Sequence, residues 1–223
     1  REVVKKKLDK HALKEDPIIE FFLRGYEYIK THQNVVFIGL IALILIVAGT
    51  FWVRNSREEA RINAANRFSE ATLFFYRGDF KSAGQIFEIV HDNFGGTREG
   101  AYASYYLGKV ANATGDYTGA INHFRNYLEK AEKYPFFSEA ARRSIATSLE
   151  NNRDFKKAGD VYAELAGEEQ DDDEKARYLE RAAECYELAG TDSKAVEILK
   201  ELLPLRDGLA EKEIKVRIDI LSR

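Results

Sequence analysis

The chain has 223 residues, enough for one hydrophobic core or for a membrane anchor followed by one folded domain. Three prolines and 15 glycines favour long helices over a turn-rich β fold, and the net charge of −3 gives no reason to expect nucleic acid as a partner. The single cysteine, Cys185, excludes an internal disulfide.

Residues 1–34 form a basic tail that ends in a short helical segment. The tail carries eight lysine or arginine residues against six acidic ones. Asp16 and Pro17 together indicate a helix start. The apolar residues that follow at helical intervals are Ile18, Ile19, Phe21, Phe22, Tyr26 and Ile29. Such a helix fits an amphipathic segment on the inner membrane face and a docking surface for a membrane partner equally well.

A single transmembrane helix is expected from Val35 to Val53. These nineteen residues contain no charge, and as a helix they span roughly 28 Å, close to the thickness of the hydrocarbon core. A buried core helix seldom stays apolar on every face over such a length. A cleaved signal peptide would have a shorter apolar stretch nearer the chain start. We therefore expect the segment to be retained and to contact the lipid bilayer.

The distribution of positive charge favours a cytoplasmic N-terminus. The tail has an excess of two positive charges (eight minus six), whereas the rest of the chain is net acidic. Close to the membrane the signal reverses, because four arginines soon follow the span and only Arg24 and Lys30 closely precede it. We favour the count over the whole tail, which puts the remainder of the chain outside the cytoplasm.

Residues 54–205 contain a repeated pattern. Turn sequences recur at spacings of 37, 38 and 37 residues, and each is followed by an alanine and then a large apolar residue. The turns begin at Gly78, Gly115, Arg153 and Gly190, the alanines are Ala83, Ala120, Ala158 and Ala195, and the large residues are Phe87, Phe124, Tyr162 and Leu199. A small residue on the first helix recurs less strictly and is clearest at Leu107-Gly108. The pattern resembles the tetratricopeptide repeat, in which a glycine ends the first helix and an aspartate caps the second.

The resemblance implies an all-α fold, an α-solenoid of about four helical hairpins closed by a capping helix within residues 206–223. The expected hairpins pair 58–76 with 80–93, 98–114 with 117–132, 137–151 with 155–167, and 174–189 with 192–203. The capping helix, Leu209 to Leu221, presents Ile214, Ile218 and Leu221 on one stripe and a charged opposite face. Since no proline or glycine lies between Thr50 and Tyr76, we expect the transmembrane helix to continue into the first repeat helix.

In tetratricopeptide arrays the first helix of each unit lines a concave face that binds peptides or partner domains, and the resemblance implies the same here. The candidate groove residues are Phe68, Phe75, Tyr76, Tyr102, Tyr105, Tyr106, Lys109, Asn112 and Arg143. Tyrosine and arginine often carry binding hot spots. Phe68 and Phe75 fit core and groove equally. We expect Tyr102, Tyr105 and Tyr106 to face the groove, because three clustered rings are not expected to point into one core.

No catalytic, cofactor or metal site is expected. The acidic run 168–174 lacks the glycine and the ligand spacing of a calcium loop, so we interpret it as a solvated link whose Asp173 caps the next helix. His91 and His123 have no ligand partners at helical spacing, and Cys185 is expected to be a small core residue. No Ser-His-Asp set or phosphate loop occurs, which indicates a protein that is not an enzyme.

The order of basic tail, Asp-Pro-led amphipathic segment, single span and tetratricopeptide repeats resembles the YfgM family of ancillary Sec-translocon subunits. This resemblance implies a bacterial inner-membrane protein with a cytoplasmic N-terminus and periplasmic repeats. Its function would be that of a scaffold beside the translocon and periplasmic chaperones, binding membrane-complex subunits or translocating polypeptides. The alternative is a structural accessory or assembly subunit of another bacterial membrane complex.

Overall fold

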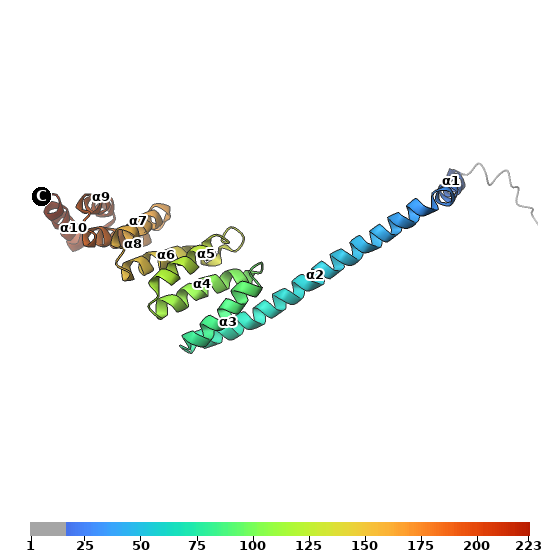
Figure 1. Ribbon diagram of the computed structural model, residues 1–223. Coiled ribbons are helices and arrows are strands. Elements are labelled where there is room, and N and C mark those ends of the chain that lie inside the picture. Colours follow the sequence, from blue (N-terminus) through green and yellow to red (C-terminus); the bar gives the residue numbers. More distant parts are fainter. Residues whose placement is uncertain (1–16) are drawn as a thin grey trace, which may run out of the picture. The chain divides into compact units, whose positions relative to one another are not determined.

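The protein is described by a computed structural model that covers residues 17–223, with side chains from Glu20 onwards. Within these residues the chain forms ten α-helices and two 3-10 turns and has no strand, which confirms the predicted all-α class (Figure 1). The expectations for the lysine-rich start of the tail and for Asp16 lie outside the described residues. The chain divides into two compact units, residues 1–58 and residues 59–223.

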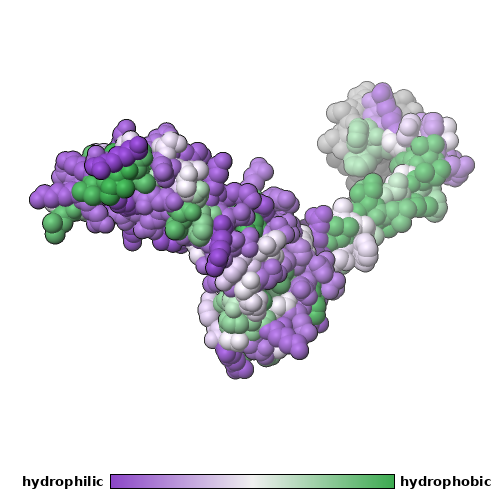
Figure 2. All heavy atoms as spheres, turned by 60° about the vertical axis from the view of Figure 1, so that its left-hand side comes forward, coloured by the Kyte–Doolittle hydropathy of each residue, from purple (hydrophilic) through white to green (hydrophobic). Residues whose placement is uncertain are grey.

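The first unit contains the helix α1 (Pro17–Thr31) and the N-terminal half of α2 (Gln33–Tyr76). The helix expected after Pro17 is therefore confirmed, and α2 is one uninterrupted helix of 44 residues, as the absence of proline and glycine after Thr50 predicts. Within the described part of the chain, α2 is the one helix long and apolar enough to cross a membrane by length and composition. The rest of the protein buries none of the most apolar 18-residue stretch of α2. Figure 2 shows apolar surface gathered over this unit.

The second unit is a row of four helical hairpins. Their first helices are the C-terminal part of α2, α4 (Arg98–Ala113), α6 (Ser138–Asn151) and α8 (Asp172–Leu188). Their second helices are α3 (Phe80–Asn93), α5 (Tyr117–Leu128), α7 (Phe155–Glu168) and α9 (Asp192–Leu202). From α3 onwards each helix packs against the next in chain order (Figure 1). The predicted pairs agree to within about two residues, except that α5 ends at Leu128 rather than at residue 132.

Two short 3-10 turns and a final helix complete the second unit. The turns η1 (Pro135–Phe137) and η2 (Leu203–Leu205) contain the two prolines of the repeat region, where no α-helical hydrogen bond is lost. The helix α10 (Gly208–Leu221) packs against α9 through Ile214, which is buried, with Ile218 and Leu221 half-buried beside it. Its opposite face is less charged than predicted, because Leu209, Val216 and Ile220 are exposed among the charges.

The same backbone turn joins the two helices of every hairpin. Gly78, Gly115 and Gly190 have φ of +80°, +83° and +65°, and the third turn places Arg153 in this left-handed region with φ of +63°. The N–H of the next residue donates to the carbonyl five residues earlier, at 3.0, 2.9, 2.8 and 2.9 Å in the four turns. This 6→1 bond is the Schellman pattern that ends α-helices. The predicted aspartate cap follows only in the first two turns, where Asp79 and Asp116 accept from the N–H of Ser82 and Gly119.

Arg153→Gly is expected to stabilise the protein by roughly 0.5–1 kcal/mol. A side chain in the left-handed region costs about 1–2 kcal/mol, and glycine removes that cost while adding some freedom to the unfolded chain. Thermal unfolding of the full chain in detergent, followed by circular dichroism, measures the difference. Gly190→Ala is the matched control and is expected to destabilise by about 1 kcal/mol. A lower melting temperature for Arg153→Gly would contradict the strain at this turn.

The repeat periodicity fixes the core. The four alanines and four large residues that recur at 37 and 38 residues are all buried. A second set of small buried residues lies on the first helices with the same spacing, namely Ala71, Gly108, Ala146 and Ala183. Small residues at these positions let neighbouring helices approach closely. Cys185 is also fully buried, as predicted, and burial raises the pKa of its thiol to about 12.

The acidic link between α7 and α8 differs in one detail from its prediction. The capping residue of α8 is Asp171, whose carboxylate accepts from the N–H of Glu174 at 2.9 Å, and not Asp173. The helix therefore begins two residues earlier than expected, because Asp171 is the first acidic residue able to reach an unpaired N–H of the first turn. Glu169 accepts from the N–H groups of Gln170 and Asp171, and these two hydrogen bonds order the link.

Candidate functional site

The first helices of successive hairpins contact one another and build a continuous face. Phe75 of α2 lies against Tyr106 of α4, with ring centroids 5.5 Å apart. Asn112 of α4 accepts a hydrogen bond from Ser148 of α6 at 2.8 Å. Further along, Glu139 and Glu150 of α6 pair with residues of α8. We call the exposed surface of α2, α4, α6 and α8 on this side the first-helix face.

The aromatic side chains expected on this face belong largely to the core. Tyr105 and Tyr106 are only 8% and 9% exposed, and their rings contact each other edge to face at 5.6 Å. The premise that neighbouring rings cannot share one core is therefore wrong. Adjacent residues on a helix point about 100° apart, so Tyr106 packs back onto Phe87 of α3 while Tyr105 stacks forward on Phe137. Each ring fills the gap between α4 and a different neighbour.

The remaining predicted rings lie at the edge of this cluster. Phe68, Phe75 and Tyr102 are half-buried and pack against it, so each contributes to the core and also reaches the surface. Tyr76 is 74% exposed, although its ring contacts Phe75. Burial raises the pKa of Tyr106, and a side-chain hydrogen bond with Tyr76 raises it further. Tyr106 is therefore uncharged at neutral pH, and together these rings form an aromatic surface on this part of the face.

Lys109 supplies the charge of the aromatic surface. Its Nζ lies 5.1 Å from the ring centroid of Phe75, 5.9 Å from that of Tyr105 and 5.7 Å from that of Tyr106. Each such contact contributes about 0.5–1 kcal/mol at an exposed site. Among the residues that the structure describes, no carboxylate forms an ion pair with Lys109. The ring faces thus hold the ammonium in place, and it can still form an ion pair with an anionic group of a partner.

Asn112 and Arg143 continue the face towards the third hairpin. Asn112 is half-buried and is engaged by Ser148, so its amide mainly joins two hairpins. Arg143 is half exposed, and its guanidinium lies 3.8 Å from both Glu139 and Glu174. These long contacts are weak at a surface, which leaves the guanidinium available. The structure thus brings together an exposed tyrosine and two accessible cations around buried rings.

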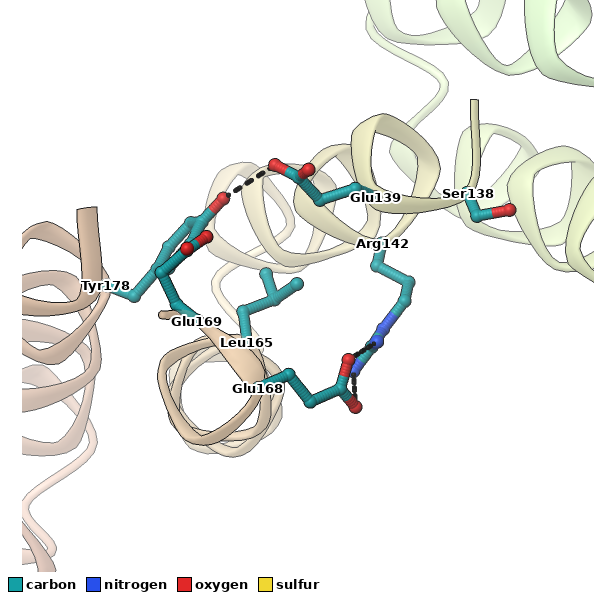
Figure 3. A pocket seen from close by; sticks show the side chains of 7 residues that line it. All are labelled: Ser138, Glu139, Arg142, Leu165, Glu168, Glu169 and Tyr178. Atoms are coloured by element: carbon teal, nitrogen blue, oxygen red, sulfur yellow. Dashed lines mark hydrogen bonds and ion pairs between the residues drawn. The ribbon is translucent and has the colours of Figure 1, made fainter. Parts of the chain in front are cut away.

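A cavity of about 300 Å³ lies between α6, α7 and α8, and Glu139 and Tyr178 form part of its lining. In Figure 3, Arg142 forms a bidentate ion pair with Glu168, and the hydroxyl of Tyr178 donates a hydrogen bond to Glu139. The side chain of Leu165 lies between these two interactions. The side chain of Ser138 points away from these groups. None of these residues was predicted as a site, since none stands out in the repeat pattern. The Arg142–Glu168 pair and the Tyr178–Glu139 hydrogen bond join α6 to α7 and α8, so these side chains contribute to the stability of the array.

In the part of the chain that the structure describes, histidine and acidic side chains do not gather into a metal site. His91 lies 2.9 Å from the hydroxyl of Ser104 through Nδ1, which satisfies a buried polar group of α4. Burial lowers the pKa of His123, and the charge of His91 adds to this. Throughout residues 17–223 no group of three or more potential ligands lies close enough to hold an ion.

Comparison with known proteins decides the family. The sequence model of the tetratricopeptide repeat-like domain matches residues 27–195, about three quarters of the chain. The chain belongs to the tetratricopeptide repeat-like domain family. Two crystal structures of a Podosopora anserina putative kinesin light chain with nearly identical TPR-like repeats, one of them a variant, have the same fold. Both are 14% identical with a TM-score of 0.50 and cover 71% of this chain, which covers 85% and 84% of theirs. No curated protein matches the chain.

Membership of the tetratricopeptide repeat-like family carries a general function. Such arrays typically have no catalytic activity. They act as scaffolds for protein–protein interaction, because their stacked units create extended concave binding surfaces. The matched stretch includes residues 35–53 as well as most of the hairpins. The tetratricopeptide repeat-like assignment therefore extends over the apolar segment and the array together.

Proposed function

We propose that the chain is a membrane-anchored scaffold that binds other proteins through its first-helix face. The exposure of α2 is the observation that supports a membrane anchor. The rest of the protein buries none of the most apolar 18-residue stretch of this helix. A soluble protein rarely leaves a contiguous apolar surface of this extent in water. A bilayer covers it along the full length of residues 35–53. The core helix of a soluble domain, the competing interpretation, would be mostly buried.

We further propose that the anchor lies in a bacterial inner membrane, with a cytoplasmic N-terminus and periplasmic repeats, and that the scaffold serves the Sec translocon and its chaperones. The order of the segments, which resembles the YfgM family, supports this assignment. The positive excess of the tail supports the orientation. The partners would then be translocon subunits or polypeptides in transit.

The partner contact is proposed to centre on Tyr76, Lys109 and Arg143. Lys109 is fixed over three rings without a carboxylate of its own among the described residues, so a carboxylate of the partner would gain an already positioned ammonium. An exposed aromatic ring beside it offers apolar contact area at a small entropic cost. The surface therefore suits an extended segment that carries an acidic residue next to an apolar one.

Co-purification from the native membrane in mild detergent tests this function. Lys109→Met keeps the alkyl length but removes the ammonium, and we expect it to lower partner recovery about tenfold, equivalent to about 1.4 kcal/mol. Arg125→Met is the matched control, because it removes one exposed charge from the second helix α5. Equal recovery with both variants would contradict a partner site on the first-helix face.

The proteins recovered in the same experiment decide the finer assignment. Translocon and chaperone subunits would support the proposed role. A stoichiometric complex unrelated to secretion would instead make the chain an accessory or assembly subunit of that complex. Recovery of no protein above the level of an empty-detergent control would contradict the scaffold function itself.

A further inference from the structure

The helix α1 presents two sharply different faces. Glu20, Arg24, Glu27 and Thr31 recur at helical spacing on one side, where Glu20 and Arg24 form an ion pair at 2.7 Å and the hydroxyl of Thr31 donates to the carbonyl of Glu27. Phe22, Tyr26 and Ile29 recur on the opposite side. These three apolar residues are 69%, 65% and 50% exposed, so no described part of the chain covers them.

The connection between α1 and the apolar segment is very short. The helix ends at Thr31, α2 begins at Gln33, and hydrogen bonding continues across the joint, from the N–H of His32 to the carbonyl of Tyr28 and from the N–H of Val36 to the carbonyl of His32. Four Cα–Cα steps separate Thr31 from the first apolar residue, Val35, a reach of at most about 15 Å. If residues 35–53 cross a bilayer, the end of α1 cannot leave the neighbourhood of the headgroup layer.

The length of α1 and its charged side chains exclude a second membrane-spanning helix. Its 15 residues are too few to cross the hydrocarbon core, and the polar stripe would be desolvated there. Arg24 and Lys30 balance Glu20 and Glu27, so α1 carries no net side-chain charge and needs no anionic lipid. A helix with one charged and polar face and one aromatic and aliphatic face suits a segment lying in the membrane interface.

We propose that α1 lies along the bilayer surface, with Phe22, Tyr26 and Ile29 in the boundary between headgroups and acyl chains and with the Glu20–Arg24 side in water. This proposal rests on the proposed membrane anchor and deepens it, because it assigns the occupant of a helix face that the sequence leaves open between lipid and protein. The lipid contact would hold the start of α2 at a fixed depth.

Tryptophan quenching in vesicles tests the position of α1. Trp52 is the only tryptophan, so the full chain with Trp52→Phe has no tryptophan fluorescence of its own. In that background Phe22→Trp places a probe on the apolar face, and Glu27→Trp places the matched probe on the polar face. Both proteins are reconstituted into phosphatidylcholine vesicles whose acyl chains carry bromine near the headgroup end. We expect brominated lipid to quench most of the emission at position 22, aqueous iodide to quench position 27, and neither probe to respond to the opposite quencher.

The outcomes separate this proposal from the anchor on which it rests. Strong iodide quenching at position 22, as at position 27, would overturn the interfacial placement. The apolar face would then lie in water in these vesicles, which contain no other protein, and its occupant in the cell would be a protein partner. The unmodified chain reports on the anchor alone through Trp52, which brominated lipid should quench if residues 35–53 are inserted. Failure of the lipid to quench Trp52 would overturn the anchor, whatever position 22 shows.

Discussion

Gly108→Ala is expected to destabilise the protein by about 2–3 kcal/mol, because the added methyl group has no room. A Cβ at this position would lie 2.7–2.8 Å from three ring atoms of Phe124. That ring is fully buried and packs against Tyr105, so it cannot move aside without disturbing the aromatic cluster. Thermal unfolding of the full chain in detergent, followed by circular dichroism, measures the loss.

Gly84→Ala is the matched control for this substitution. Gly84 also lies within a helix, α3, but a Cβ there would meet Val110 at 3.5 Å, an ordinary contact. Since alanine is favoured over glycine inside helices by about 0.5–1 kcal/mol, this variant should be as stable as the parent or more so. Similar losses in both variants would contradict close approach of α4 and α5 as the reason for a glycine at residue 108.

Tyr127→Phe is expected to cost about 2–3 kcal/mol, although it removes a single oxygen atom. The hydroxyl of Tyr127 donates to the carbonyl of Tyr134 at 2.6 Å and accepts from the N–H of Phe137 at 2.8 Å. The side chain is fully buried, so the variant leaves two backbone groups of the link between α5 and α6 without partners. Urea unfolding of the full chain in detergent gives the change in free energy.

Tyr134→Phe, in the same link, tests whether the effect depends on burial. Its hydroxyl donates to the carbonyl of Gly96 at 3.3 Å in an exposed position. Its loss should therefore change the free energy of unfolding by less than about 0.5 kcal/mol. Equal losses for Tyr134→Phe and Tyr127→Phe would show that the buried hydroxyl does not order the link.

The repeat architecture could be predicted from the sequence because its signals are periodic. A glycine turn at Gly78 and the recurring alanine and aromatic positions specify helix ends and core contacts locally, and these predictions are confirmed. The small-residue set that includes Gly108 follows the same 37 and 38 residue spacing. The recurrence of a small residue, expected to be less strict, is exact when the units are aligned on Ala71, Ala146 and Ala183. Arg153 shows the limit of local reasoning, since its left-handed backbone is imposed by the repeated turn rather than by its own preference.

The candidate site was harder to predict because it depends on which helix face turns inward. Tyr105 and Tyr106 look alike in sequence, and both are buried because η1 folds Phe137 over one while α3 covers the other. That arrangement also changes how the site must be tested. Alanine at either tyrosine would remove core packing worth about 3–5 kcal/mol and could not isolate partner binding. Lys109 and Tyr76, which reach the surface beside these rings, are the informative positions.

Photo-crosslinking in the native membrane tests whether a partner binds the first-helix face. A benzoylphenylalanine residue at Tyr76 places the crosslinker on the first-helix face, and the same residue at Glu88 places it on the exposed side of the second helix α3. We expect a membrane-associated adduct with a partner polypeptide from position 76 and none from position 88. Lys109→Met should lower the yield of the adduct from position 76 about tenfold. An adduct from position 88 alone, or one from position 76 that persists unchanged with Lys109→Met, would contradict partner binding through the first-helix face.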